Sequence, residues 1–324
     1  MLQSQLLANE ETEAALVRLN TEGRLPHAVL LEGPRGSGRF TLARFISGAA
    51  LCRVNPAGCG ECPDCRLAAE GKHPDVEVYA RSGAPGTLTI SGLRAIRQSA
   101  ATPPVQGRRR VVILRDIQDA AQQRTLNTLL KLIEEPPEYL MFIITADSRQ
   151  NLLPTIVSRC LTLRMRLPDT GQCAGELERR LALAPEEAVA LSSYCSGNIG
   201  RALALREDSE DARALNDAAE ITRCILGGEP YRLLCALQKY ERNRAGMRLL
   251  VAHLQEIFSR LVRARYEPEG TLFYESARRL SVWRGERMLE ALDRAAQEGQ
   301  ANVNLPLALT RLAAGLMQEE TVKR

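Results

Sequence analysis

The sequence lacks the features of a membrane-spanning or secreted chain. No apolar run approaches the roughly 18 residues that a transmembrane helix needs. The first twenty residues are acidic and amphipathic, without a basic segment followed by an apolar core. We therefore expect no transmembrane segment, no secretory signal and a cytoplasmic location.

The sequence also contains few lysines and has no strong net charge of either sign. Only four of the 43 basic residues are lysines, and the net charge is +4. So weak a positive balance permits a nucleic-acid partner without requiring one. Hydrophobic residues at 45% and charged residues at 25% exclude an intrinsically disordered chain.

The cysteines argue against a disulfide framework, because there are nine of them and no signal sequence precedes them. Four lie in one Gly- and Pro-containing loop: Cys52, Cys59, Cys62 and Cys65. Four thiolates at this spacing suit a closed tetrahedral zinc site with a structural role. An iron–sulfur cluster is an alternative, since the last three form C-x2-C-x2-C, but the usual downstream cysteine–proline is missing. Four free thiols are the remaining possibility.

Hydrophobic patterning divides the chain. Residues 1–166 alternate short apolar runs with helically spaced segments, which predicts an α/β domain with a parallel sheet and helices on both faces. The runs cover residues 28–31, 76–78, 111–114, 141–145 and 161–163. Beyond Pro168 the pattern is helical throughout. We expect a small helical lid over 167–208 and an all-α C-terminal domain over 209–324, with the cysteine loop (52–65) as an insertion in the first domain.

A glycine loop follows the first apolar run and precedes a helical pattern. The sequence GPRGSGRFT over residues 33–41 approaches the phosphate-loop pattern G-x-x-x-x-G-K-[ST]. Gly33, Gly36 and Gly38 supply the turn, but Arg39 replaces the lysine and Phe40 replaces the hydroxyl that ligands magnesium. Phosphoryl transfer depends on such positioned charges, so we expect the loop to have lost hydrolysis and nucleotide binding to be doubtful. An unrelated glycine-rich turn is the alternative interpretation.

The acidic motif on the next buried strand is also incomplete. An ATPase strand should end in Asp followed by Glu, whereas residues 115–118 read Arg-Asp-Ile-Gln. Asp116 is the one carboxylate left, and capping a turn explains it at least as well as binding a metal.

Together these motifs resemble one family. The loop at 33–38, the four-cysteine insertion, LNTLLKLIEEPP (126–137) and Ser158-Arg159-Cys160 follow in the order found in bacterial clamp-loader ATPases of the AAA+ class. The resemblance covers roughly residues 5–205. It implies an AAA+ domain, a lid and a helical collar domain. The departures at Arg39, Phe40 and Arg115 set the chain apart from the catalytic subunits of that family.

The resemblance also implies roles for single residues. Arg159 matches the arginine finger that reaches a neighbouring subunit's ATP, although an arginine in a surface turn is the simpler reading. Thr145 matches the polar sensor near the γ-phosphate, or is only a β-branched strand end. Arg201, in the segment Gly197-Asn-Ile-Gly-Arg201, matches a second residue that senses phosphate. Alternatively it only caps a helix or forms an ion pair.

These readings predict a stationary subunit of the DNA polymerase III clamp loader, without ATP hydrolysis of its own. The polymerase activity would belong to the complex. The implied partners are gamma/tau and delta subunits and, through the complex, the sliding clamp and primed DNA. Two alternatives are an ATP-hydrolysing motor subunit, and a zinc-containing DNA-binding module that uses the cysteine loop and Arg108–Arg110.

Overall fold

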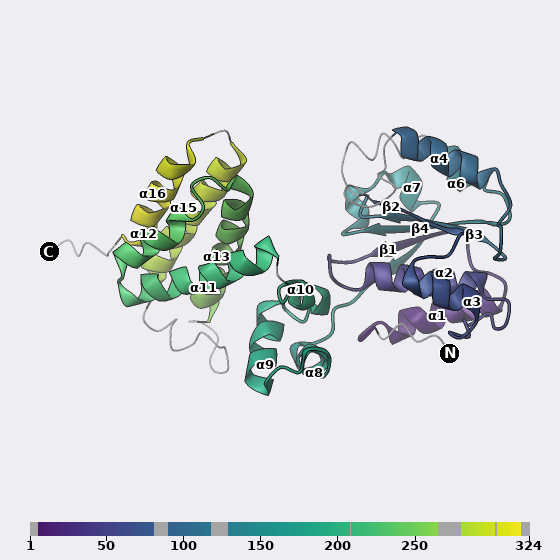
Figure 1. Cartoon of the computed structure of the whole chain (residues 1–324), viewed down its shortest axis with the longest axis horizontal. Coiled ribbons are helices and arrows are strands. Elements are labelled where there is room, and N and C mark those ends of the chain that lie inside the picture. Colours follow the sequence, from purple (N-terminus) through teal and green to yellow (C-terminus); the bar gives the residue numbers. More distant parts are fainter. Residues whose placement is uncertain are drawn as a thin grey trace. The chain divides into compact units, whose positions relative to one another are not determined.

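The computed structural model describes residues 6–80, 90–117, 129–207, 209–264, 280–301 and 303–318. The chain forms two compact units, Met1–Arg201 and Ala202–Arg324 (Figure 1). The expected boundaries at 166 and 208 stay predictions. Residues 126–128 of the LNTLLKLIEEPP motif lie outside the described residues. Within the described residues, no helix is both long and apolar enough to cross a bilayer.

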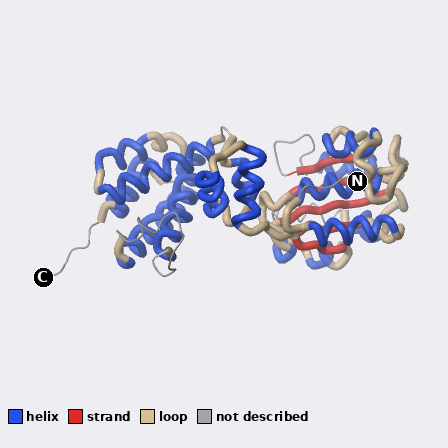
Figure 2. The backbone as a smooth tube through the Cα atoms, turned by 90° about the horizontal axis from the view of Figure 1, so that it is seen from below, coloured by secondary structure: helices blue, strands red, loops and turns tan. Residues whose placement is uncertain are grey.

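A five-stranded parallel sheet forms the centre of the first unit, as the apolar runs predict (Figure 2). The strands are β1 (Ala28–Glu32), β2 (Val76–Ala80), β3 (Arg110–Arg115), β4 (Leu140–Ala146) and β5 (Leu161–Arg164). Their order is β2-β3-β4-β1-β5, and each pair is parallel. β1 lies between β4 and β5, so the loop that follows it begins in the interior of the sheet.

Helices cover both faces of the sheet because alternate strand residues point to opposite sides. Leu30, Val112 and Phe142 pack on the face covered by α4 (Ile90–Ala100), α6 (Leu130–Glu134) and α7 (Pro154–Val157). Leu31, Ile113 and Ile143 pack on the other, with α1 (Glu10–Thr21) and α2 (Arg39–Leu51) (Figure 1). Burial of both faces explains the unbroken apolar runs and confirms the predicted α/β class.

Short helices complete this unit. α3 (Pro63–Glu70) begins at Cys62 of the cysteine loop, and a 3-10 turn (Arg149–Asn151) follows β4. After β5 the chain is helical, with α8 (Thr170–Leu181), α9 (Pro185–Tyr194) and α10 (Ile199–Ala204). α8 starts with a reciprocal capping box between Asp169 and Gln172, which satisfies backbone N–H groups at the helix start.

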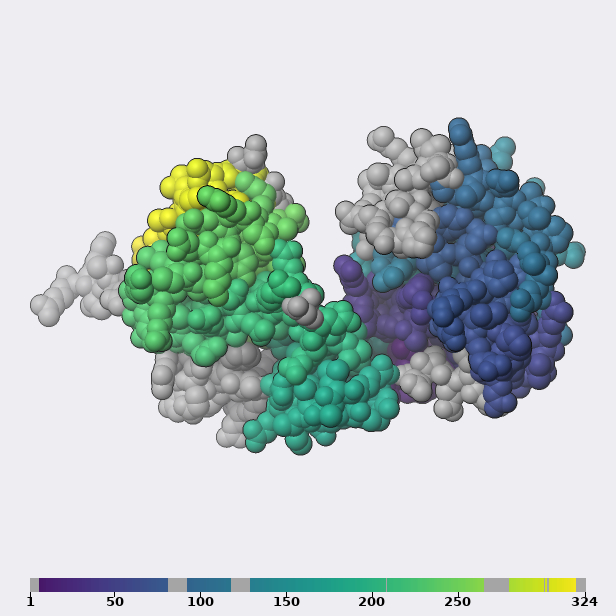
Figure 3. Space-filling model, in the orientation of Figure 1, coloured from purple at the N-terminus to yellow at the C-terminus, as the bar shows by residue number. Residues whose placement is uncertain are grey.

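The C-terminal unit is all helical in its described residues, as expected. It contains α11 (Glu210–Gly227), α12 (Pro230–Gln238), α13 (Arg244–Arg263), α15 (Val282–Gln300) and α16 (Leu305–Leu316). Long α13 buries Leu250, Leu254 and Phe258. Residues of α11 to α13, in green, form most of the unit's surface in Figure 3.

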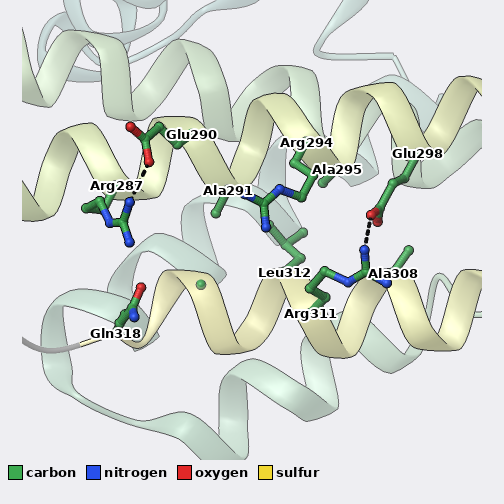
Figure 4. A pocket seen from close by; sticks show the side chains of 11 residues that line it. Arg287, Glu290, Ala291, Arg294, Ala295, Glu298, Ala308, Arg311, Leu312 and Gln318 are labelled. Atoms are coloured by element: carbon green, nitrogen blue, oxygen red, sulfur yellow. Dashed lines mark hydrogen bonds and ion pairs between the residues drawn. The ribbon is translucent and has the colours of Figure 1, made fainter.

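Small residues let α15 and α16 pack closely. A Cβ on Gly315 would lie 2.7 Å from Cβ of Ala291. Ion pairs Arg287–Glu290 and Arg311–Glu298 lie along the shallow groove of these helices, with Arg294 between them (Figure 4). The exposed rims of this helix pair are thus charged while its seam is made of small side chains.

A buried carboxylate ties the segment before β3 to the segment before β2. Asp75 is fully buried and accepts hydrogen bonds from the backbone N–H groups of Val105, Gln106 and Gly107, at 2.6, 2.8 and 2.7 Å. Burial acts to raise the pKa of this carboxyl, but the three N–H donors outweigh it and hold the pKa below its ordinary value.

We predict that Asp75→Asn lowers the free energy of unfolding by about 2 kcal/mol at pH 7, because an amide has one acceptor oxygen where the carboxylate has two. The folded-state pKa is depressed, so this stabilisation is present above about pH 4 and is lost as the pH falls through the folded-state value. Urea unfolding at several pH values measures the effect. Glu138→Gln, at an exposed position, is the control. An Asp75→Asn protein as stable as the wild type at pH 7 would contradict the prediction.

Candidate functional site

The glycine loop between β1 and α2 has the backbone that the sequence predicts. Gly36 and Gly38 adopt φ of +89° and +88°, a region that side chains with a Cβ rarely enter. Gly38 is the N-cap residue of α2, without a side-chain cap. Gly33 needs its small size, since a Cβ there would lie 2.8 Å from Cβ of Met165.

Arg39, at the lysine position of the motif, points into an acidic pair. Its Nη2 lies 3.0 Å from Oδ1 of Asp116 and 2.7 Å from Oδ1 of Asp147. The arginine side chain is 4% exposed, whereas the aspartates are 26% and 42% exposed. One guanidinium therefore joins the start of α2 to the carboxyl ends of β3 and β4.

Two polar groups of the loop keep free hydrogen-bonding capacity. Nη1 of Arg39 and Oγ of Ser37 are buried, and neither has a partner within the part of the chain that the structure describes. Both groups could donate a hydrogen bond to an anion bound at the loop.

Phe40, at the position of the magnesium-binding hydroxyl, lies between two guanidinium groups. The Cζ atoms of Arg44 and Arg115 are each 4.6 Å from the centroid of its ring. Such cation–π contacts stabilise the ring in place. A phenyl ring between two cations offers no oxygen to a metal ion.

Thr145 and Asp116 form one polar cluster with Arg39. The backbone N–H of Asp116 donates to Oγ1 of Thr145 at 2.9 Å, and that hydroxyl donates to Oδ1 of Asp116 at 3.3 Å. Asp116 has φ of +54°, an uncommon conformation for a residue with a Cβ. Its carboxylate pairs with Arg39 and Arg115 and accepts a hydrogen bond from Thr145, whereas a role as a turn cap or as a metal ligand stays a prediction.

The segment before α10 lies directly on the glycine loop. The side chain of Asn198 donates to the backbone oxygen of Arg35 at 2.8 Å, and the N–H of Gly200 donates to that of Gly36 at 3.2 Å. Oδ1 of Asn198 accepts the backbone N–H of Arg201, whose guanidinium lies over the ring of Tyr194 at 5.2 Å. These contacts tie the backbone of the loop to the start of α10.

An open hollow of about 730 Å³ borders the loop at the carboxyl ends of β1, β4 and β5. Ligands of open α/β sheets commonly bind at this edge. The lining residues are Ala8, Glu11, Thr12, Glu32, Gly33, Pro34, Asp147, Ser148, Arg164, Met165, Arg166 and Leu167.

Arg159 makes its contacts apart from the loop, just after α7. Its Nη2 lies 2.8 Å from Oε1 of Glu134, and its Nη1 donates to the backbone oxygen of Thr155 and to Oγ of Ser158. The arginine side chain is 37% exposed. Cys160 packs against the sheet core, where burial raises the pKa of its thiol to about 12 and so keeps it unreactive.

The arginine triplet 108–110 is not a uniform basic surface. Arg110 is buried and pairs with Glu77 at 3.1 Å, and Arg109 donates to the backbone oxygen of Leu25. Burial also lowers the pKa of Arg109. Arg108 is exposed and donates to the backbone oxygen of Arg53. Two of the three cations therefore hold the structure together.

The four loop cysteines come together at one point. Their Sγ atoms all lie within 4.8 Å of one another, and Cys52 is 3.7 Å from Cys59 and 3.9 Å from Cys62. Sulfurs that bind one tetrahedral zinc at about 2.3 Å stand ~3.8 Å apart, so the donor set fits a single metal ion.

Backbone N–H groups donate to these sulfurs. Asn55 donates to Cys52, Cys62 to Cys59 and Cys65 to Cys62, at 3.3, 3.3 and 3.4 Å. The donors at Cys62 and Glu61 lower the pKa of Cys59 to about 6, whereas burial raises the pKa of Cys65. A thiolate is thus favoured on the exposed side of the cluster, as metal binding requires.

The structure places the predicted residues in three groups. The first group is the glycine loop and its surroundings, with Gly33, Gly36, Gly38, Arg39, Thr145 and the backbone of Arg201. Arg159 lies apart from it, next to Glu134, and the four cysteines form a third group. Asp147 and Asn198 were missed as site residues. Asp147 directly follows an apolar strand, and Asn198 lies inside the second-sensor segment; those positions were the available signals.

Comparisons with known proteins point to one group. The sequence model of the family described as DNA polymerase III, delta subunit matches residues 8–169. DNA polymerase III subunit tau of Escherichia coli (strain K12) is 28% identical over 230 residues, covering 68% of this chain. DNA polymerase III subunit delta' of Pseudomonas aeruginosa is 34% identical over 179 residues, covering 55% of this chain.

The matched regions span 34% of the tau protein and 54% of the delta' protein. Among solved structures, a DNA polymerase III gamma subunit-related protein from Thermotoga maritima has a TM-score of 0.50 at 18% identity, covering 95% of this chain and 98% of its own. This likeness concerns the fold and agrees with the predicted architecture.

We predict that Arg39→Met lowers the free energy of unfolding by about 2 kcal/mol, because it removes the buried cation that pairs with both Asp116 and Asp147. The stability of Arg39→Lys should lie between that of Arg39→Met and that of the wild type, since an ammonium keeps the charge without the guanidinium geometry. Urea unfolding measures both. Arg94→Met, at an exposed arginine of α4, is the control and should change stability by less than ~0.5 kcal/mol. Equal stability of Arg39→Met and wild type would refute the bridging role.

Proposed function

Since this chain belongs to the DNA polymerase III clamp-loader family, we propose that it is a stationary subunit of the complex, of the delta' kind, that hydrolyses no ATP itself. One observation carries the proposal. The cation of Arg39 is fixed between Asp116 and Asp147, where a motor would need a lysine free for phosphate and carboxylates free for magnesium.

Two further features support the loss of hydrolysis. Phe40 stands between Arg44 and Arg115 at the metal-ligand position, and no glutamate follows Asp116 to orient a water. Hydrogen bonds from Asn198 and Gly200 also tie the backbone of the loop to the start of α10. The alternative motor role has less support, because each group that it needs is absent or already paired.

Arg159 supplies the subunit's contribution to chemistry in this proposal. It would reach the ATP of a neighbouring motor subunit as an arginine finger, stabilising the negative charge of the transition state. Its side chain is partly exposed at the end of α7, and the segment is anchored by Cys160 in the core. Thr145 and Arg201 would then keep structural contacts rather than sense a phosphate.

The proposal includes the partners of such a subunit. Gamma/tau and delta subunits would form the complex with it in the cytoplasm, and the complex would place a sliding clamp on primed DNA. The C-terminal helices would serve as the collar that joins subunits. The DNA-binding alternative has less support, since Arg109 and Arg110 are engaged within the chain.

We also propose that the cysteine cluster holds one structural zinc ion. Four sulfurs leave no ligand position for water, so zinc would stabilise the 52–65 loop and the start of α3 without joining the reaction.

In a complex reconstituted with motor subunits, we predict that Arg159→Ala reduces DNA-dependent ATP turnover and clamp loading about tenfold, since a finger contributes roughly 10³–10⁵ in rate at its own site in other NTPases. The isolated wild-type chain should show no turnover. Arg94→Ala is the matched control. Unchanged loading by Arg159→Ala, or sustained ATP turnover by the isolated chain, would overturn the proposed role.

For the metal, we predict about one zinc per purified chain by elemental analysis. Removing it with a chelator, or by Cys59→Ser, should lower Tm by about 5 °C, and added zinc should restore only the chelated wild type. Cys235→Ser, at an exposed cysteine outside the cluster, is the control. Iron and sulfide in place of zinc would favour the iron–sulfur alternative.

A further inference from the structure

Glu134 is the only carboxylate that pairs with Arg159 in the described part of the chain. The guanidinium has three acceptors: Oε1 of Glu134 at 2.8 Å, the backbone oxygen of Thr155 at 2.9 Å and Oγ of Ser158 at 3.2 Å. Because both Nη1 and Nη2 are held, the contacts fix the plane of the guanidinium as well as its distance from Glu134.

Both partners stand on firmly packed backbone. Glu134 ends α6 directly after Ile133, which is fully buried, and Pro136 and Pro137 restrict the chain that follows. Arg159 follows α7, whose Ile156 is also fully buried. The separation of the two side chains is therefore set by the core beneath them.

The position of Glu134 is unfavourable by itself. It lies at the C-terminal end of a helix, where unpaired backbone carbonyls repel a carboxylate. The adjacent guanidinium offsets that repulsion. Glu135 is next in the chain, is equally acidic and exposed, and has no ion-pair partner in the described residues. Pairing is thus specific to one of two neighbouring glutamates.

We propose that Glu134 is a positioning residue that pre-orders Arg159 for a neighbouring subunit's ATP. The inference rests on the proposed finger role of Arg159. Of the five N–H donors of a guanidinium, the three contacts occupy three. In the described part of the chain, this leaves Nε–H and one hydrogen of Nη2 to donate to a phosphate oxygen while the other contacts persist.

This arrangement has a kinetic consequence. An arginine already held in place loses less side-chain freedom when the transition state forms, so the benefit falls on kcat rather than on ATP binding. The neutral amide of glutamine still offers an oxygen to Nη2, whereas alanine offers none.

The test uses the complex reconstituted with motor subunits, measuring DNA-dependent ATPase with Glu134→Ala, Glu134→Gln and the control Glu135→Ala. We expect Glu134→Ala to lower kcat about fivefold, as suits a half-exposed ion pair. KM for ATP should stay within about twofold. Glu134→Gln should recover most of the turnover, and Glu135→Ala should match wild type. Complex assembly and thermal melts show whether each variant is folded.

A double variant separates positioning from general structure. On the Arg159→Ala background, Glu134→Ala should have no further effect, because the residue acts only through the arginine. An additive loss, a raised KM alone, or turnover equal to or above wild type in Glu134→Ala would overturn the inference while Arg159→Ala stays defective. If Arg159→Ala is itself as active as wild type, the proposed finger role fails, which is a different result.

Discussion

The contact between the Arg39 guanidinium and two carboxylates organises the candidate site. It connects the first residue of α2 with Asp116 after β3 and Asp147 after β4, three segments that are distant in sequence. The arginine side chain is almost fully buried while both aspartates are partly exposed, so the pairs compensate a cation that is removed from water. Asp116, whose backbone has φ of +54°, is also hydrogen-bonded to the hydroxyl of Thr145, and Phe40 directly follows Arg39 in the chain.

That contact also stabilises the glycine loop, whose sequence resembles a phosphate-binding loop. Anions normally satisfy the N–H groups and charges of such a loop. Here Nη2 of Arg39 is paired within the chain, and Asn198 and Gly200 donate to backbone oxygens of the loop. Arg159 is likewise held by contacts within the chain, to Glu134, Thr155 and Ser158.

The sheet gives these contacts their geometry. Parallel strands bring their carboxyl ends to one edge, so residues that follow β1, β3 and β4 meet without being near in sequence. Apolar side chains on both faces make the edge stiff. The cysteine cluster is more local: its four sulfurs lie within fourteen residues between the end of α2 and the start of α3, and nearby backbone N–H groups donate to them.

Alternating apolar runs and helical spacing were enough to predict the parallel sheet and the helical remainder, which the structure confirms. The motifs drew attention to the glycine loop and to the four cysteines, whose sulfurs the structure brings together. The sequence could not identify Asp147 as the partner of Arg39, Asn198 as a tie to the loop, or Glu134 rather than Glu135 as the partner of Arg159. Those pairings depend on strand order and on which face of a helix end meets its neighbour. Strand order and the facing of helix ends are set by contacts between residues that are distant in sequence. The spacing of residues along the chain does not reveal such contacts.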